Sequence, residues 1–213
     1  MEAAEKRTER ERAPEDYLAL AINAWQEKNV EEGLGWAYFG LNLNPKNNET
    51  KVGLYNVLGS IYQGRKWYKP AEENYKKALE INEKAYLVHY NLGIVYYDQK
   101  LYDNAERQYK ETLRLKPDFR SAYNNLAFIL FDIAQYEEAL NHFNTSIEIK
   151  TTPDSYAGKA ISLSKLDQQE EALSAYKTAV SQDSKYLDLT RMRNEKSWSE
   201  QALEAARELI DRL

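Results

Sequence analysis

The feature of this chain that most constrains its fold is a pattern of residues that recurs every 34 positions. Residues 52–119 hold two clean copies, each reading ring-x-x-Leu-Gly-x-x-Tyr and then Ala-x-x-x-Tyr. The matching residues are Tyr55, Leu58, Gly59, Tyr62, Ala71 and Tyr75 in the first copy, and His89, Leu92, Gly93, Tyr96, Ala105 and Tyr109 in the second. A fixed period of this length indicates a stacked-repeat architecture.

Three further copies surround these two. One follows from Tyr123, and the next starts one residue early at Tyr156, which we attribute to a shorter loop around residues 150–153. A weaker upstream copy around Tyr17 is offset by four residues, which we place in the polar stretch 47–50. The predicted repeats are 14–47, 52–85, 86–119, 120–152 and 153–186, after a charged extension at 1–13.

The residue types explain why each copy should form a pair of helices. Apolar residues recur at steps of three and four, which places them on one face of a helix. Small residues such as Gly59 and Ala71 mark the points where two helix backbones approach closely. A single copy cannot bury its own apolar face, so about three or more must stack before a continuous core exists.

With these residues the chain resembles the tetratricopeptide-repeat (TPR) family, whose signature is W-x2-L-G-x2-Y, then A-x3-F, then P. The resemblance covers roughly residues 14–186 and departs at Lys159, Thr151 and Ser184. It implies an all-α, right-handed solenoid of stacked antiparallel helix pairs. It also implies that the first helices of successive pairs line a concave groove.

Residues 187–213 follow the last repeat, and we predict that they form a pair of capping helices. Ser197 and Ser199 are candidate N-caps, and Ser197 is spaced from Glu200 as in a capping box. An apolar stripe would then face the last repeat: Trp198, Ala202, Ala206, Leu209 and Leu213. The alternative is that this helix docks on a partner.

Composition and motifs argue against catalysis and against nucleic-acid binding. The chain has no cysteine, and its net charge is -5 from 29 basic and 34 acidic residues. His89 occupies a packing slot, and His142 lies in no metal-ligand spacing. The acidic pairs recur where second helices begin, a position that suits the helix dipole. We therefore predict no enzyme activity, catalytic residue, cofactor or metal.

No apolar run is long enough to span a membrane, and no apolar segment of a signal peptide follows Met1. These observations favour a cytoplasmic location without membrane insertion.

The groove residues are the candidate site. Asn91 and Asn125 occupy the same position (slot) of successive repeats. A ladder of amides can form hydrogen bonds with the main chain of a peptide. Asparagine is, however, also common at this slot of the repeat. Aromatic and aliphatic side chains nearby suggest an interaction surface, unless the chain's own tail or a neighbouring subunit covers them. The predicted partner-binding residues are Asn56, Tyr90, Asn91, Ile94, Tyr97, Asn124, Asn125, Phe128 and Phe131.

The sequence thus predicts a non-catalytic scaffold or adaptor that binds an extended or helical segment of another protein, within a larger assembly. The alternative is a structural protein that assembles with copies of itself. Lysines and an arginine that hold a carboxylate in some family members are replaced here by residues such as Leu18 and Asn56. Binding of chaperone C-termini in that manner is therefore not expected.

Overall fold

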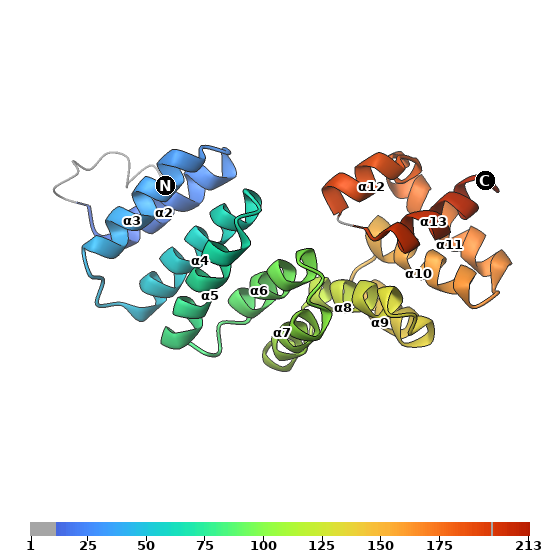
Figure 1. Ribbon diagram of the computed structural model, residues 1–213, viewed down its shortest axis with the longest axis horizontal. Coiled ribbons are helices and arrows are strands. Elements are labelled where there is room, and N and C mark those ends of the chain that lie inside the picture. Colours follow the sequence, from blue (N-terminus) through green and yellow to red (C-terminus); the bar gives the residue numbers. More distant parts are fainter. Residues whose placement is uncertain (1–11, 197) are drawn as a thin grey trace. The chain divides into compact units, whose positions relative to one another are not determined.

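The computed structural model describes residues 12–196 and 198–213, of which residues 195 and 196 only as backbone. Over these residues the chain forms twelve α-helices and one 3-10 helix and no strand, and the helices follow one another in pairs (Figure 1). The predicted all-α architecture of stacked helix pairs is confirmed. The chain divides into two compact units, Met1–Gln99 and Lys100–Leu213, each treated by itself below.

Unit 1 holds two helix pairs and the first helix of a third. Its helices are α2 (Pro14–Gln26), α3 (Val30–Asn42), α4 (Asn48–Gly64), α5 (Tyr68–Ile81) and α6 (Tyr86–Asp98). The four residues that offset the first repeat do not form a loop. Most of them extend the start of α4, where Asn47 acts as N-cap by accepting a hydrogen bond from the backbone N–H of Glu49.

Unit 2 continues the pattern and adds a tail. Its helices are α7 (Tyr102–Leu115), α8 (Arg120–Asp132), α9 (Tyr136–Ile149), α10 (Pro153–Lys165), α11 (Gln169–Gln182), the 3-10 helix η1 (Ser184–Leu187), α12 (Leu189–Lys196) and α13 (Glu200–Ile210). Ser199 is the N-cap of α13, as predicted, and its Oγ accepts from the backbone N–H of Ala202 at 3.1 Å. The predicted capping box at Ser197 lies outside the described residues.

The backbone repeats as the sequence does. A non-glycine residue adopts the left-handed conformation after the first helix of each pair, with φ between 58° and 64°, at Lys28, Lys66, Lys100, Ala134 and Asp167. In the second pair the N–H of Trp67 returns to the carbonyl of Tyr62, and in the fourth the N–H of Gln135 returns to Leu130. These bonds satisfy carbonyls that a helix end would leave unpaired.

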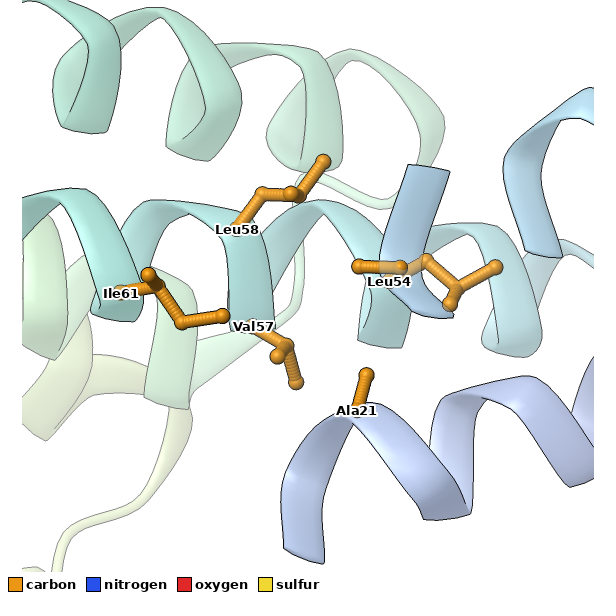
Figure 2. Packing of buried hydrophobic residues seen from close by; sticks show 6 residues of the cluster. Ala21, Leu54, Val57, Leu58 and Ile61 are labelled. Atoms are coloured by element: carbon orange, nitrogen blue, oxygen red, sulfur yellow. The ribbon is translucent and has the colours of Figure 1, made fainter. Parts of the chain in front are cut away.

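The core lies between the two helices of a pair and between successive pairs. In unit 1 it gathers Ala21, Ala37, Leu54, Val57, Leu58 and Ile61. Figure 2 shows Val57 of α4 and Ala21 of α2 pointing toward each other, whereas Leu58 points to the opposite side of α4. One ring slot of the repeat is fully buried in each of four pairs, at Tyr75, Tyr109, Phe143 and Tyr176.

Candidate protein-binding surfaces

Helix α6 of unit 1 carries apolar residues on two faces. One face, with Val88, Leu92 and Val95, is buried. The other, called the α6 stripe below, recurs at steps of three and four residues and consists of Leu87, Tyr90, Ile94 and Tyr97. Leu87 is 46% exposed and the other three are half-buried. A helix that is apolar all round normally has both faces covered.

Asn91, one of the two residues of the predicted amide ladder, bonds to Asn56, another predicted groove residue. Within unit 1, Asn91 Nδ2 donates to Asn56 Oδ1 at 3.0 Å, and both side chains are half-buried. An amide side chain has two N–H donors and one carbonyl oxygen, and this bond uses one donor of Asn91. The pair therefore presents a polar element beside the α6 stripe.

Asn125, the expected second member of the ladder, is engaged within unit 2. Its Nδ2 donates to the hydroxyl of the buried Tyr109 at 3.3 Å. The same slot holds Gly158 one repeat later, where a Cβ atom would lie 2.2 Å from Phe143 Cε1. In unit 2 this slot thus faces the buried ring of the preceding pair.

Asn124 lies in a buried hydroxyl network and is only 7% exposed. Its Oδ1 accepts from Ser155 Oγ at 3.1 Å, and Ser155 Oγ also lies 2.7 Å from Ser146 Oγ and 2.9 Å from Thr152 Oγ1. One hydroxyl can donate once and accept twice, so Ser155 is saturated by these three partners. Asn124 therefore holds α10 to α8.

The two predicted rings of α8 are also buried, Phe128 at 7% and Phe131 at 0% exposure. The ring of Phe128 meets Phe143 edge-on at 5.0 Å between centroids, and on another side it meets Trp198 of the tail at 5.2 Å. Phe131 packs at 5.3 Å from Tyr136. In this structure the chain's own tail covers Phe128, which is one of the alternatives that the sequence leaves open.

The tail is fixed at one end by polar contacts from α8 and α9. Ser199 Oγ donates to Asp132 Oδ1 at 2.5 Å, and Gln201 Nε2 donates to Tyr136 Oη at 2.6 Å. Tyr102 Oη donates to the other carboxylate oxygen of Asp132 at 3.3 Å. Burial, together with the charge of Asp132, raises the pKa of Tyr102 to about 12, so its hydroxyl stays protonated near neutral pH.

Unit 1 also has a cleft, which the sequence did not predict. It is a polar cleft of about 460 Å³ between α3, α4 and α5, lined in part by Tyr38, Tyr62, Asn74 and Lys77. The hydroxyls of Tyr38 and Tyr62 lie 2.6 Å apart. Burial and this hydrogen bond raise the pKa of Tyr38 to about 12. Its residues come from different repeats, so no local motif signals it.

Sequence reasoning also missed two members of the surfaces above. Leu87 precedes Tyr90 by three residues and continues its stripe, so helical periodicity was a sufficient signal. Asp132 is a single carboxylate at the end of α8, and nothing local indicates that it accepts from a residue 67 positions later.

In the described part of the chain, no group of three or more histidine, cysteine, aspartate and glutamate side chains is placed to hold a metal ion. Among the same residues, no helix has the length and apolar character needed to cross a bilayer.

Comparisons with known proteins agree with this architecture. Two models of the tetratricopeptide repeat match the chain, over residues 52–84 and 85–152. No curated protein sequence matches it.

Solved structures with a similar fold include PilF of Pseudomonas aeruginosa, with 21% identity and a TM-score of 0.71 over 92% of this chain and 88% of that one. YrrB, described as a TPR protein with an unusual peptide-binding site, has 19% identity and a TM-score of 0.64 over 92% and 96% of the two chains. MamA has 18% identity and a TM-score of 0.65 over 78% and 95%. At these identities the likeness concerns the fold. From its repeats, its paired helices and the matched family models, we conclude that the chain belongs to the tetratricopeptide-repeat proteins.

Proposed function

We propose that this chain is a non-catalytic scaffold that binds an extended or helical segment of another protein, and that the α6 stripe is the main contact. The observation that carries the proposal is the second apolar face of α6, where Leu87 is 46% exposed beside half-buried Tyr90, Ile94 and Tyr97. A contiguous apolar surface that is partly exposed usually marks an interaction site.

The paired amides of Asn56 and Asn91 can form hydrogen bonds with the main chain of a bound segment. Asn56 and Asn91 lie on neighbouring first helices, and their mutual bond leaves Asn91 with a further N–H donor. An extended or helical segment can thus combine apolar anchors on the α6 stripe with hydrogen bonds to the amides. The description of YrrB as a peptide-binding TPR protein supports a role of the same general kind.

The predicted groove residues of α8 are less accessible to a partner than the α6 stripe. Phe128, Phe131 and Asn124 are buried, and Asn125 is bonded to Tyr109. A partner that contacts Phe128 must first replace Trp198. We therefore assign the primary contact to unit 1.

The test is capture of partners from a lysate of the native host, followed by mass spectrometry. Leu87→Glu places a charge on the α6 stripe, and Leu43→Glu is the matched control, since Leu43 is also in unit 1 and is 44% exposed. We expect a partner that is held by the wild type and by Leu43→Glu and lost by Leu87→Glu. Partners that bind equally to all three proteins would contradict the assignment.

Self-assembly is the second candidate, because an exposed apolar stripe can also accept another copy of the chain. It predicts that the mass measured by light scattering rises with concentration for the wild type and not for Leu87→Glu. A constant monomer mass for the wild type would exclude it.

The amides are tested separately with Asn91→Ala in the purified complex. Losing a hydrogen-bonded polar contact should weaken binding by about tenfold, corresponding to roughly 1–1.5 kcal/mol. Unchanged affinity would leave the apolar stripe as the only determinant and remove the amides from the site.

A further inference from the structure

Helix α13 does not take the position of a next repeat helix. A helix that opens a pair packs mainly on the second helix of its own pair, and of the preceding pair it contacts the second helix more than the first, as α10 contacts α9 more than α8. Helix α13 instead packs mainly on α10, reaches α8, and contacts α11 less. It thus lies against the first helices of two successive pairs. The surface of α8 and α10 beneath α13 is called the tail site below.

The tail site contains residues whose equivalents in the repeat of unit 1 are only half-buried. Phe128 and Phe131 on α8 correspond, one repeat earlier, to Ile94 and Tyr97 on α6. The latter two are only half-buried, whereas Phe128 and Phe131 are almost fully buried. Stacking of the repeats therefore does not in itself require a helix over these slots. This suggests that α13 occupies its position as a ligand would, in addition to its role in the chain.

The residues that α13 and its N-cap bury indicate which kind of partner helix the tail site can bind. Just before α13, the ring of Trp198 packs on Phe128, and the hydroxyl of the N-cap Ser199 donates to Asp132. Small residues then allow a close approach of the backbone. The remaining buried residues are Ala202, Leu203, Ala205, Ala206 and Leu209.

The opposite face of α13, with Glu204, Arg207 and Glu208, is exposed. The helix is thus amphipathic, and it has the pattern of a helix docked in a groove. Only Trp198, Leu203 and Leu209 contribute large apolar side chains to the contact. Their burial must offset the entropy lost in ordering a helix of 11 residues and its connection. The small alanines add little burial, which favours reversible docking.

We propose that the tail site is a second protein-binding site, which takes an amphipathic partner helix with a large aromatic residue, a hydroxyl cap and small residues on its buried face. Helix α13 is its built-in competitor. The inference rests on the proposed protein-binding role but concerns unit 2, so it is independent of the α6 stripe. A tethered helix acts at a high effective concentration, so a partner binds only to the fraction of molecules whose site is open.

The probe is a labelled peptide with the sequence of residues 198–213, measured by fluorescence anisotropy against the full-length chain. Trp198→Ala removes the ring that seats α13 and should raise the affinity for the peptide at least tenfold over the wild type. Leu187→Ala is the matched control, because Leu187 is an apolar residue just before α12 and is 46% exposed. It should bind the peptide as the wild type does.

A second variant ties the peptide to the tail site. Phe128→Leu added to Trp198→Ala keeps an apolar side chain in the core but removes the ring beneath the peptide's tryptophan. It should lower the affinity for the peptide about tenfold relative to Trp198→Ala alone. Leu87→Glu added to Trp198→Ala should leave it unchanged, which separates this site from the α6 stripe.

Hydrogen exchange separates a displaceable ligand from a structural element. In Trp198→Ala we expect faster exchange over residues 198–210 and unchanged exchange over α7 to α11. Faster exchange throughout α7 to α11 would show that α13 is an integral part of the fold and would overturn the proposal. So would a peptide that binds Trp198→Ala no more tightly than the wild type.

Discussion

Two helices of this chain, α6 in unit 1 and α8 in unit 2, occupy the same place in successive repeats and differ in what covers them. Tyr90, Ile94 and Tyr97 on α6 are half-buried. Their counterparts 34 positions later, Asn124, Phe128 and Phe131, are almost fully buried. The repeat thus determines the fold of a helix pair. The segments that pack on each pair determine how far the residues at these positions are exposed.

The difference has a local chemical origin. The tail brings Trp198 onto Phe128, and the hydroxyl of Ser155 bonds to Asn124. Ile94 and Tyr90 occupy the equivalent positions of α6 and are only half-buried. Comparing the two helices therefore separates residues that hold the fold from residues available to a partner.

The largest effect should come from Phe128→Ala compared with Ile94→Ala. Phe128 lies between Phe143 and Trp198, so its truncation should lower the free energy of unfolding of unit 2 by about 3–5 kcal/mol. Ile94 is half-buried, and its truncation should cost about 1 kcal/mol. Urea unfolding followed by hydrogen exchange in each unit measures both. Equal losses would mean that α6 is covered as α8 is.

Much of the fold was predictable because the repeat carries its own packing rules. The buried ring slot, at Tyr75, Tyr109, Phe143 and Tyr176, follows from the spacing alone. Most of the residues at 47–50, where we place the offset, form the first turn of α4, because Asn47 caps a helix that begins at Asn48. A capping residue within a polar stretch is a signal that the repeat pattern does not include.

The site was less predictable, because exposure depends on contacts between distant segments. The pattern places Phe128 and Ile94 at the same position of successive repeats. It cannot show that Trp198, 70 positions after Phe128, packs on the Phe128 ring. Similarly, Asn56 and Asn91 bond to each other, a contact that the repeat pattern does not indicate. Asn56 and Asn91 occupy different positions of successive repeats, and their side chains still meet.

A second comparison concerns buried and half-buried amides. Asn124→Ala removes the acceptor of Ser155 in a buried network and should lower the free energy of unfolding by about 2 kcal/mol. Asn56→Ala removes an acceptor from Asn91, but water can replace it at this half-buried position, so the loss should be below about 1 kcal/mol. The difference shows up in thermal unfolding. A larger loss for Asn56→Ala would show that the amide pair holds unit 1 together.

Glycine substitutions test whether packing beneath the tail is tight. A methyl group at Gly158 would lie 2.2 Å from Phe143 Cε1, so Gly158→Ala should displace this ring and destabilise unit 2 by about 1–2 kcal/mol. Gly35 lies within α3 with nothing within 4 Å of the added atom, so Gly35→Ala should stabilise unit 1 by about 1 kcal/mol.

Because Phe143 supports Phe128, and Phe128 supports Trp198, Gly158→Ala should also speed exchange over residues 198–210. Gly35→Ala serves as its control in the same exchange experiment. If Gly158→Ala leaves the tail protected as in the wild type, the three rings do not act as one stack.

The smallest effect should come from the turns, where the two units are alike. Ala134 and Lys66 both adopt the left-handed conformation, with φ of 61° and 59°. Glycine removes the steric cost of this conformation but adds entropy to the unfolded chain, so Ala134→Gly and Lys66→Gly should each stabilise by about 0.5 kcal/mol. Equal shifts in urea unfolding would confine the difference between the units to their inner slots. A stabilisation in one unit only would show that the turns also differ, and that the repeat is less uniform than its backbone angles indicate.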